Sequence, residues 1–134
     1  MATDTRAELA RLTLDFTEAF NEDDLDKVMG FFSDDAIYDE FHSARHEGAA
    51  AIRAAFAPQF SGSFGKVRFA EEDHFIDADP SAAGTGKALI SWTCSIETKQ
   101  GPGAWRGLDI LHFRDGKVVQ KHTYAKTKAP LMIK

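Results

Sequence analysis

The sequence of 134 residues has few of the features that place a protein in a class at once. It contains one cysteine, which excludes an internal disulfide, and no apolar run approaches the roughly 20 residues that a membrane-spanning helix needs. The net charge is −5 and the lysines and arginines are scattered, so neither a nucleic-acid surface nor membrane insertion is expected. The composition favours a globular protein whose partner is a small molecule or another protein.

Familiar catalytic and nucleotide-binding motifs are also missing. The sequence has no GxSxG turn, no GxGxxG after a strand, no phosphate-binding loop and no metal-binding spacing of cysteines, so we expect no cofactor. Its start, MATDTRAELARL, lacks the apolar core of a signal peptide, and a cytoplasmic location is expected. Cys94 lies in an apolar strand pattern and is expected to be a small core residue rather than a nucleophile.

Three helices are predicted in the first half of the chain. Leu9, Leu12, Phe16 and Phe20 recur at spacings of three and four, which predicts an amphipathic helix over about residues 4–21. A short second helix is predicted for LDKVMGFF. A third is predicted for the alanine-rich stretch AAAIRAAFAPQF, with its end near Pro58.

The later part of the chain changes to the period of two that is typical of strands. Strands are predicted for KVRFAEEDHFID, KALISWTCSIE, WRGLDILHF and KVVQKHTYAK, and a tight hairpin for Asp115-Gly116. With one earlier strand in DDAIYDEFHSARHEG, the order becomes α-α-β-α-β-β-β-β within a single domain of residues 1–134. We therefore expect an α+β fold, in which the helices pack on one face of a curved, mostly antiparallel sheet that encloses a pocket.

The early strand presents two faces that periodicity alone does not distinguish. Tyr38 and Glu40 lie on one side, whereas Ile37, Asp39 and Phe41 lie on the other, so each side carries apolar bulk and a carboxylate. If the Tyr38 side is internal, the Glu40 carboxylate enters a cavity. The alternative is that Glu40 lies at a solvated strand end.

A second candidate carboxylate lies in WRGLDILHF. Trp105, Asp109, Leu111 and Phe113 share one face of this strand, and if that face is concave, Asp109 lies in an apolar wall. Desolvation there favours the neutral acid, which donates a hydrogen bond. The alternative is that Asp109 binds a neighbouring strand or an arginine. Two carboxyl groups in different environments are suited to proton transfer.

The histidines allow several interpretations. His122 and Tyr124 lie two apart on the last predicted strand and are expected to share a face with Val118, either in the pocket or in ordinary sheet packing. His42 and His46 are four apart, a spacing that binds a metal on a helix, but here it falls on a predicted loop. We therefore predict no metal site.

Three stretches together resemble the NTF2-like superfamily, in its ketosteroid isomerase and SnoaL-like polyketide cyclase branch. They are FTEAFNEDDLDKVMGFFSDDAIYDE, HEGAAAIRAAF and GLDILHFRDGKVV. The resemblance implies a cone-shaped, cystatin-like fold. It places Glu40 at the position of the catalytic base and Asp109 at that of the protonated aspartate in the oxyanion hole. Phe16 stands where the isomerases carry a tyrosine donor, which argues against steroid isomerisation itself.

The leading functional hypothesis is a cofactor-independent isomerase or cyclase that transfers a proton on a small hydrophobic carbonyl compound. Glu40 is the expected base and Asp109 the expected donor, in a pocket lined by Phe16, Phe20, Tyr38, Phe56, Trp92, Trp105, His122 and Tyr124. The alternatives are a non-catalytic module that binds a ligand or protein, and a dehydratase-type lyase that uses His122 with a tyrosine. A homodimer is also expected, because the outward faces of the later strands carry Leu89, Leu108, Ile110 and Val119.

Overall fold

One curved sheet forms the centre of the fold, as the computed structural model shows for residues 4–42, 44–63 and 65–126. The helices are α1 (Thr5–Ala19), α2 (Leu25–Met29) and α3 (Ala49–Phe60). The strands are β1 (Phe32–Asp39), β2 (Arg45–Glu47), β3 (Lys66–Ala78), β4 (Gly86–Thr98), β5 (Gly101–Arg114) and β6 (Lys117–Ala125). The sequence does not predict the arrangement of the tail KTKAPLMIK. All of this tail after Lys126 lies outside the described residues.

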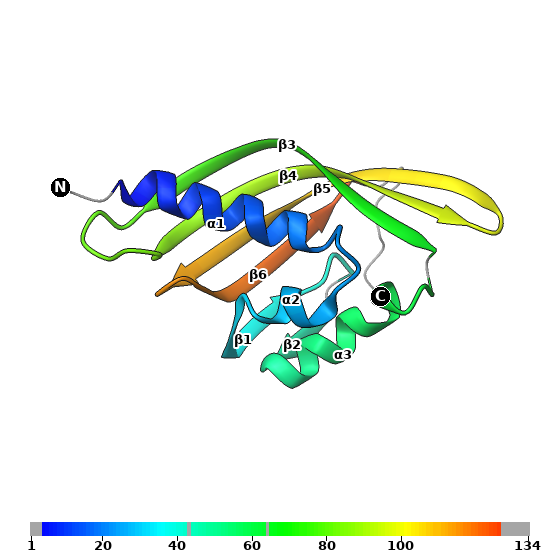
Figure 1. Ribbon diagram of the computed structural model, residues 1–134, viewed down its shortest axis with the longest axis horizontal. Coiled ribbons are helices and arrows are strands. Elements are labelled where there is room, and N and C mark those ends of the chain that lie inside the picture. Colours follow the sequence, from blue (N-terminus) through cyan, green and yellow to red (C-terminus); the bar gives the residue numbers. More distant parts are fainter. Residues whose placement is uncertain (1–3, 43, 64, 127–134) are drawn as a thin grey trace, which may run out of the picture.

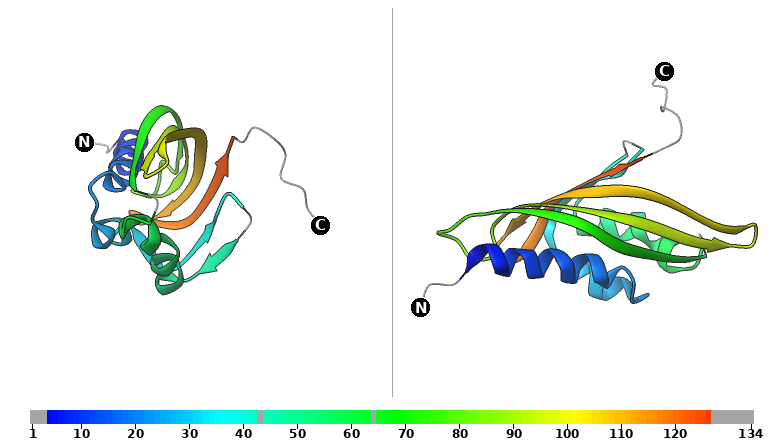
Figure 2. Two further views of the ribbon diagram at one scale, coloured as in Figure 1. Left: turned by 90° about the vertical axis from the view of Figure 1, so that its right-hand side faces the viewer. Right: turned by 90° about the horizontal axis from the view of Figure 1, so that it is seen from above.

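The strand order is β2-β1-β6-β5-β4-β3, and every neighbouring pair is antiparallel except β1 and β6, which are parallel (Figure 1). The helices gather on one side of the curved sheet: α1 packs against β3 and β4, and α3 against β1 and β2 (Figure 2). The expected α+β architecture of helices on a curved, mostly antiparallel sheet is confirmed. No helix in the described ranges is long and apolar enough to span a membrane.

Helix α1 is held against the sheet by its apolar stripe and by one side chain after its end. Leu9, Phe16 and Phe20 are buried, as their spacing predicts. Beyond the helix, the Asn21 side chain pairs with the backbone of β3: Nδ2 donates to the carbonyl of Phe69 at 2.9 Å, and Oδ1 accepts from its amide at 2.7 Å. These contacts fix α1 beside the part of β3 that borders the pocket.

Element boundaries differ from the prediction where backbone pairing overrides local pattern. The second helix ends at Met29, because Phe32 already pairs with Val118 in the parallel β1–β6 ladder. The three-residue strand β2 was not predicted; it pairs with β1 over a stretch that has no alternating pattern of its own. Helix α3 continues past Pro58 to Phe60, since a proline in the last turn removes only one helical hydrogen bond.

An extra residue in β6 decides which of its side chains enter the interior. Phe113 pairs with Val118, but His112 pairs with Gln120, so Val119 is left without a partner and forms a bulge. Beyond the bulge the alternation is inverted: Lys121 is buried beside Leu111, while His122 lies opposite outward-facing Ile110. The expectation that His122 and Tyr124 share a face with Val118 is therefore wrong.

Candidate functional site

Two adjoining pockets lie between the sheet and the helices. The first, the lysine pocket, has a volume of about 110 Å³ and contains the side chains of Asp109, Lys121 and Thr123. The second, the glutamate pocket, has a volume of about 400 Å³ and contains Glu40 and His42. The two pockets share the wall residues Tyr38, Phe41, Phe56, Gln59, Phe69 and Trp105. The larger volume falls in the range of about 300–1,000 Å³ that is typical of small-molecule sites.

Aromatic side chains form most of the lysine-pocket wall. The ring centroid of Phe56 lies 5.2 Å from that of Phe20 and 4.8 Å from that of Tyr38. Phe69 packs edge to face on Trp92 with a centroid distance of 5.0 Å, a favourable geometry for aromatic pairs. Of the residues expected from the sequence to line the pocket, those found in its wall are Phe20, Tyr38, Phe56, Trp92 and Trp105.

Phe16 belongs to the hydrophobic core and is not in either pocket wall. Its side chain is fully enclosed by other apolar residues, and its ring lies 5.4 Å from that of Phe32. The next residue of α1, Thr17, lines the lysine pocket instead, and its hydroxyl donates to the carbonyl of Thr13 at 3.0 Å. Successive helix residues point about 100° apart, so the helix turns Thr17, rather than Phe16, toward the ligand space.

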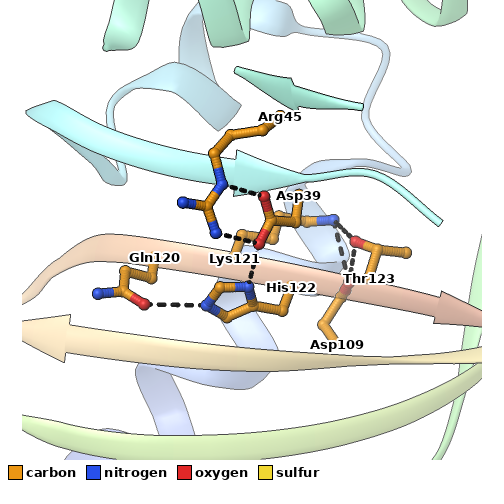
Figure 3. A network of polar contacts seen from close by, with 7 residues as sticks. All are labelled: Asp39, Arg45, Asp109, Gln120, Lys121, His122 and Thr123. Atoms are coloured by element: carbon orange, nitrogen blue, oxygen red, sulfur yellow. Dashed lines mark hydrogen bonds and ion pairs between the residues drawn. The ribbon is translucent and has the colours of Figure 1, made fainter. Parts of the chain in front are cut away.

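A buried ion pair forms the floor of the lysine pocket. Lys121 Nζ donates to Asp109 Oδ1 at 3.0 Å and to Thr123 Oγ1 at 2.6 Å, and Thr123 Oγ1 donates to Asp109 Oδ1 at 2.6 Å (Figure 3). Trp92 Nε1 donates to the other carboxylate oxygen of Asp109 at 3.1 Å. The indole reaches this position because Gly107, opposite Trp92 in the sheet, leaves room for the ring.

These partners contradict the expected role of Asp109 as a protonated donor. The indole N–H and the ammonium group can only donate, and both donate to this carboxylate. Asp109 therefore acts as an acceptor that holds Lys121. The sequence pattern indicated its burial correctly, but it did not indicate a cation on the next strand.

Lys121 is kept charged in spite of its burial. Desolvation works to lower its pKa, but it is outweighed by nearby negative charge, that of Asp109 foremost, and by the hydrogen bond to Asp109, so the pKa of Lys121 is raised. Its Nζ also lies 4.5 Å from the ring centroid of Tyr38, a cation–π contact. Burial in turn raises the pKa of the Tyr38 phenol. The pocket therefore combines a neutral phenol with a permanent ammonium donor.

Glu40 follows β1 on the same side as Tyr38 and contacts two histidines. Its Oε2 lies 2.5 Å from His42 Nε2, and its Oε1 lies 2.8 Å from His46 Nε2. The ring of His46 is stacked on that of Tyr38 with centroids 5.7 Å apart. The carboxylate is therefore held at the pocket wall by imidazoles. Within the described ranges, no group of three or more histidine, cysteine or acidic side chains is arranged to hold a metal ion.

His122 and Tyr124 lie on the opposite face of the sheet from the lysine pocket, so their expected place in the pocket wall is wrong. His122 Nδ1 contacts Asp39 Oδ2 at 2.7 Å, and Asp39 also accepts two hydrogen bonds from Arg45 (Figure 3). The Arg45 guanidinium holds the pKa of Asp39 below its usual range. Because His122 and Tyr38 face opposite sides, the histidine of the lyase hypothesis lies outside the lysine pocket. His122 and Tyr124 instead line a separate pocket of about 360 Å³, which Glu40 also borders.

Cys94 is buried at the side of the glutamate pocket. Its side chain is 1% exposed, and burial raises the pKa of its thiol to about 12. A thiol with this pKa is not a nucleophile at neutral pH, as the strand pattern predicts.

The profile of the SnoaL-like domain matches residues 14–121, which is most of the chain. The chain belongs to the SnoaL-like domain family. The match confirms the resemblance to SnoaL-like proteins that the three sequence stretches indicated. In a comparison with curated proteins, none matches the sequence of this SnoaL-like domain.

Solved structures share the fold of this SnoaL-like domain at low sequence identity. An NTF2-like protein of unknown function from Mesorhizobium loti is 21% identical, with a TM-score of 0.71 and coverage of 95% of this chain and 98% of that chain. A proposed polyketide cyclase from Pseudomonas putida KT2440 is 19% identical, with a TM-score of 0.70 and coverages of 88% and 91%. SalBIII, an epoxide hydrolase/cyclase-like enzyme in pyran ring formation of salinomycin, is 14% identical, with a TM-score of 0.76 and coverages of 90% and 92%.

Four polar residues of the site in this SnoaL-like domain were not predicted from the sequence: Lys121, Thr123, Gln59 and Thr17. The first two are turned inward by the β6 bulge, which has no sequence signal such as glycine. A lysine followed by histidine and threonine looks like an ordinary solvated strand. Gln59 lies in the last turn of α3, beyond the proline at which the helix was expected to end.

Proposed function

We propose that this protein is a cofactor-independent enzyme of the isomerase or cyclase type, which transfers a proton on a small, mostly apolar carbonyl compound. One observation carries the proposal: a buried ammonium group faces an aromatic pocket whose neighbouring pocket holds a carboxylate. Lys121 and Glu40 are the two groups, and Tyr38 borders both pockets. A positioned cation and a positioned base are what enolisation requires.

In the proposed reaction the substrate carbonyl oxygen accepts a hydrogen bond from Lys121. Glu40 then removes a proton from the carbon beside the carbonyl, and the C–H electron pair moves into an enolate. The ammonium group stabilises the negative charge that develops on oxygen. Return of the proton from Glu40 to another carbon completes an isomerisation. Alternatively, attack of the enolate carbon on a second carbonyl carbon of the substrate closes a ring and forms an alkoxide, which takes the proton back from Glu40.

Asp109 acts in this scheme as a positioning residue rather than as a donor to the substrate. Together with Thr123 it accepts two of the three ammonium hydrogens of Lys121 and fixes the direction of the third. His46 and His42 hold the Glu40 carboxylate in a similar way. The family membership and the cyclase-like structural neighbours support a reaction of this class.

The experiment that tests the proposal is deuterium exchange at C2 of 1-indanone in D₂O, followed by proton NMR. The wild-type protein is expected to accelerate exchange over buffer, and Glu40→Gln to lower the rate by at least about a hundredfold. His122→Gln, on the outer face of β6, serves as the control and should keep the rate. An undiminished rate in Glu40→Gln contradicts the assignment of the base.

A non-catalytic ligand-binding module is the second candidate. It is favoured by the engagement of both Glu40 oxygens, since each already contacts a histidine. This candidate expects 1-indanone to bind, as measured by calorimetry, without any exchange at C2. Binding without exchange would therefore replace the enzymatic proposal with this one.

A homodimer through the outer face of the sheet is also proposed. Leu89 and Ile110 are paired there, and exposed Phe75 lies opposite Leu89 in the same row. A second row pairs Leu108 with the exposed Tyr124. An apolar surface of this kind on a sheet face is typical of a protein–protein contact.

A further inference from the structure

Two imidazole rings lead from the Glu40 carboxylate toward solvent. Glu40 Oε1 lies 2.8 Å from His46 Nε2, and Glu40 Oε2 lies 2.5 Å from His42 Nε2. The exposed fraction of the side chain rises from 17% for Glu40 to 26% for His46 and 49% for His42. Because an imidazole accepts and donates protons near neutral pH, a proton that reaches Glu40 has neighbours that can pass it outward.

The ion pair at the floor of the lysine pocket is closed off by comparison. The side chains of Lys121 and Asp109 are 6% and 8% exposed, and both contact Thr123. The pKa of Lys121 is raised, so its ammonium group keeps its protons. Exchange of protons between the site and water is therefore expected at Glu40 rather than at Lys121.

The two histidines are held in different ways. His46 lies opposite Tyr38 in the β1–β2 ladder, and its ring stacks on that of Tyr38 with centroids 5.7 Å apart. His42 comes after the end of β1 and lines the glutamate pocket with a half-exposed side chain. Segments outside the strands are more mobile than paired ones. His46 is therefore suited to hold Glu40 in place, and His42 to turn between the carboxylate and water.

The direction of the Glu40 contacts has to change during the proposed reaction. An ionised carboxylate only accepts, so each Nε2 atom donates to Glu40 at the start. Once Glu40 has taken the substrate proton, its carboxyl group donates. A His42 ring whose own proton is on Nδ1 accepts this proton at Nε2, and the resulting imidazolium turns to solvent and releases it to water. The carboxylate is then ionised again, and a solvent proton reaches the enolate by the reverse route.

We propose that His42 exchanges the proton of Glu40 with water before a proton returns to the substrate, and that His46 is a positioning residue that holds the carboxylate at the pocket wall. The inference rests on the proposed function for the role of Glu40, and it adds the origin of the proton that the product receives. It also gives each of the two histidine contacts a separate role in the reaction.

The test follows the isomerisation of 3-cyclohexenone to 2-cyclohexenone in D₂O, in which C2 loses a proton and C4 gains one. Absorbance of the conjugated product gives the rate, and mass spectrometry gives the deuterium content per product molecule, which reports the origin of the proton independently of the rate. The wild type should place deuterium at C4 of most product molecules. Protium at C4 of most wild-type product would overturn the proposal.

His42→Gln keeps an N–H donor for Glu40, but its amide does not accept and release a proton. The deuterium content at C4 should therefore fall at least about fivefold in this variant, because Glu40 returns the substrate's own proton. A deuterium content equal to that of the wild type would overturn the role of His42. The matched control is His74→Gln on β3, since His74 Nδ1 contacts Glu71 at 2.7 Å outside both pocket walls. This control should match the wild type in rate and in deuterium content.

Substitutions of His46 should give the opposite result. His46→Leu removes a donor to Glu40, so the carboxylate is less well placed and the isomerisation rate should fall about tenfold or more, with the deuterium content unchanged. His46→Gln restores a donor and should recover most of the rate. A full rate in His46→Leu, or a loss of deuterium equal to that in His42→Gln, would contradict the positioning role.

1-Indanone separates failure of this inference from failure of the proposed function. Its exchange at C2 requires a solvent proton, so His42→Gln should exchange at least about fivefold more slowly than the wild type. Equal exchange in the two proteins, with Glu40 still required, would overturn the role of His42 alone. Absence of any Glu40-dependent exchange or isomerisation in the wild type would overturn the proposed function, and this inference with it.

Discussion

Lys121 Nζ lies 3.0 Å from Asp109 Oδ1, and the two side chains are 6% and 8% exposed. This contact joins β6 to β5 on the inner face of the sheet. Asp109, which the sequence predicted to be a neutral hydrogen-bond donor, instead accepts a hydrogen bond from the Lys121 ammonium group. A lysine held in this way keeps its charge without a large reorganisation when negative charge develops next to it. The chemistry of the pocket therefore depends on the pair, not on either residue alone.

The ion pair is expected to respond asymmetrically to substitution. Lys121→Met alone leaves the buried Asp109 carboxylate without its cation and should lower the free energy of unfolding by about 3–5 kcal/mol. The double variant with Asp109→Asn should recover most of that loss, since the amide still accepts from Trp92. Urea unfolding monitored by circular dichroism measures both. A double variant as unstable as the single one would contradict this account of the pair.

Stability should decline at alkaline pH because of two pocket residues. The pKa values of Tyr38 and Lys121 are raised above the usual values of 10.0 and 10.5 for these side chains. In the unfolded chain both groups lose their protons at lower pH, so their contribution to stability is full below about pH 10 and falls as pH rises further. Tyr38→Phe should flatten the decline in the free energy of unfolding between about pH 9 and 11, because it removes the part that comes from Tyr38 and leaves the part that comes from Lys121. A wild-type slope in that variant would refute the assignment.

Gly107 is predicted to be irreplaceable even by alanine. A Cβ atom there would lie 2.5 Å from Trp92 Cη2 and 2.6 Å from the carbonyl oxygen of Tyr124, and the backbone cannot readily move away. Gly107→Ala should cost about 1–3 kcal/mol in unfolding free energy and change the near-ultraviolet circular dichroism of the tryptophans. Gly103→Ala on the same strand is the control, because its Cβ meets only Ile96 at 3.4 Å. Equal effects of the two substitutions would contradict the packing argument.

The outer sheet face should mediate dimer formation. Sedimentation velocity at micromolar concentration is expected to give a dimer for the wild type. Ile110→Asp, in the centre of the apolar row, should give a monomer, whereas Ala83→Asp in the exposed turn between β3 and β4 should remain a dimer. A wild-type monomer at this concentration would rule out the homodimer.

The strong periodic patterns predicted the fold because each was supported by burial. The helix stripe of α1 and the alternation of β4 both match their buried faces. The inner face of β1 was a choice between Tyr38 and Ile37 that alternation left open; the resemblance favoured Tyr38, which is buried. Local patterns were sufficient wherever one face of an element was clearly more apolar than the other.

The site was predicted less well because its polar residues depend on long-range pairing. Burial of Asp109 followed from its own strand, but its partner Lys121 is on another strand whose register is shifted by a bulge. Because Val119 is unpaired, the pocket is lined by Lys121 and Thr123 instead of the expected His122 and Tyr124. Such a register shift results from strand pairing, and no residue type in the β6 sequence predicts it.

The most direct test of the central claim is a crystal structure of the protein with 1-indanone bound. The carbonyl oxygen should lie within about 3.2 Å of Lys121 Nζ, and carbon C2 within about 3.5 Å of a Glu40 carboxylate oxygen. Ligand bound in the pocket with its carbonyl turned away from Lys121, or bound beside His122 on the outer face, would contradict it.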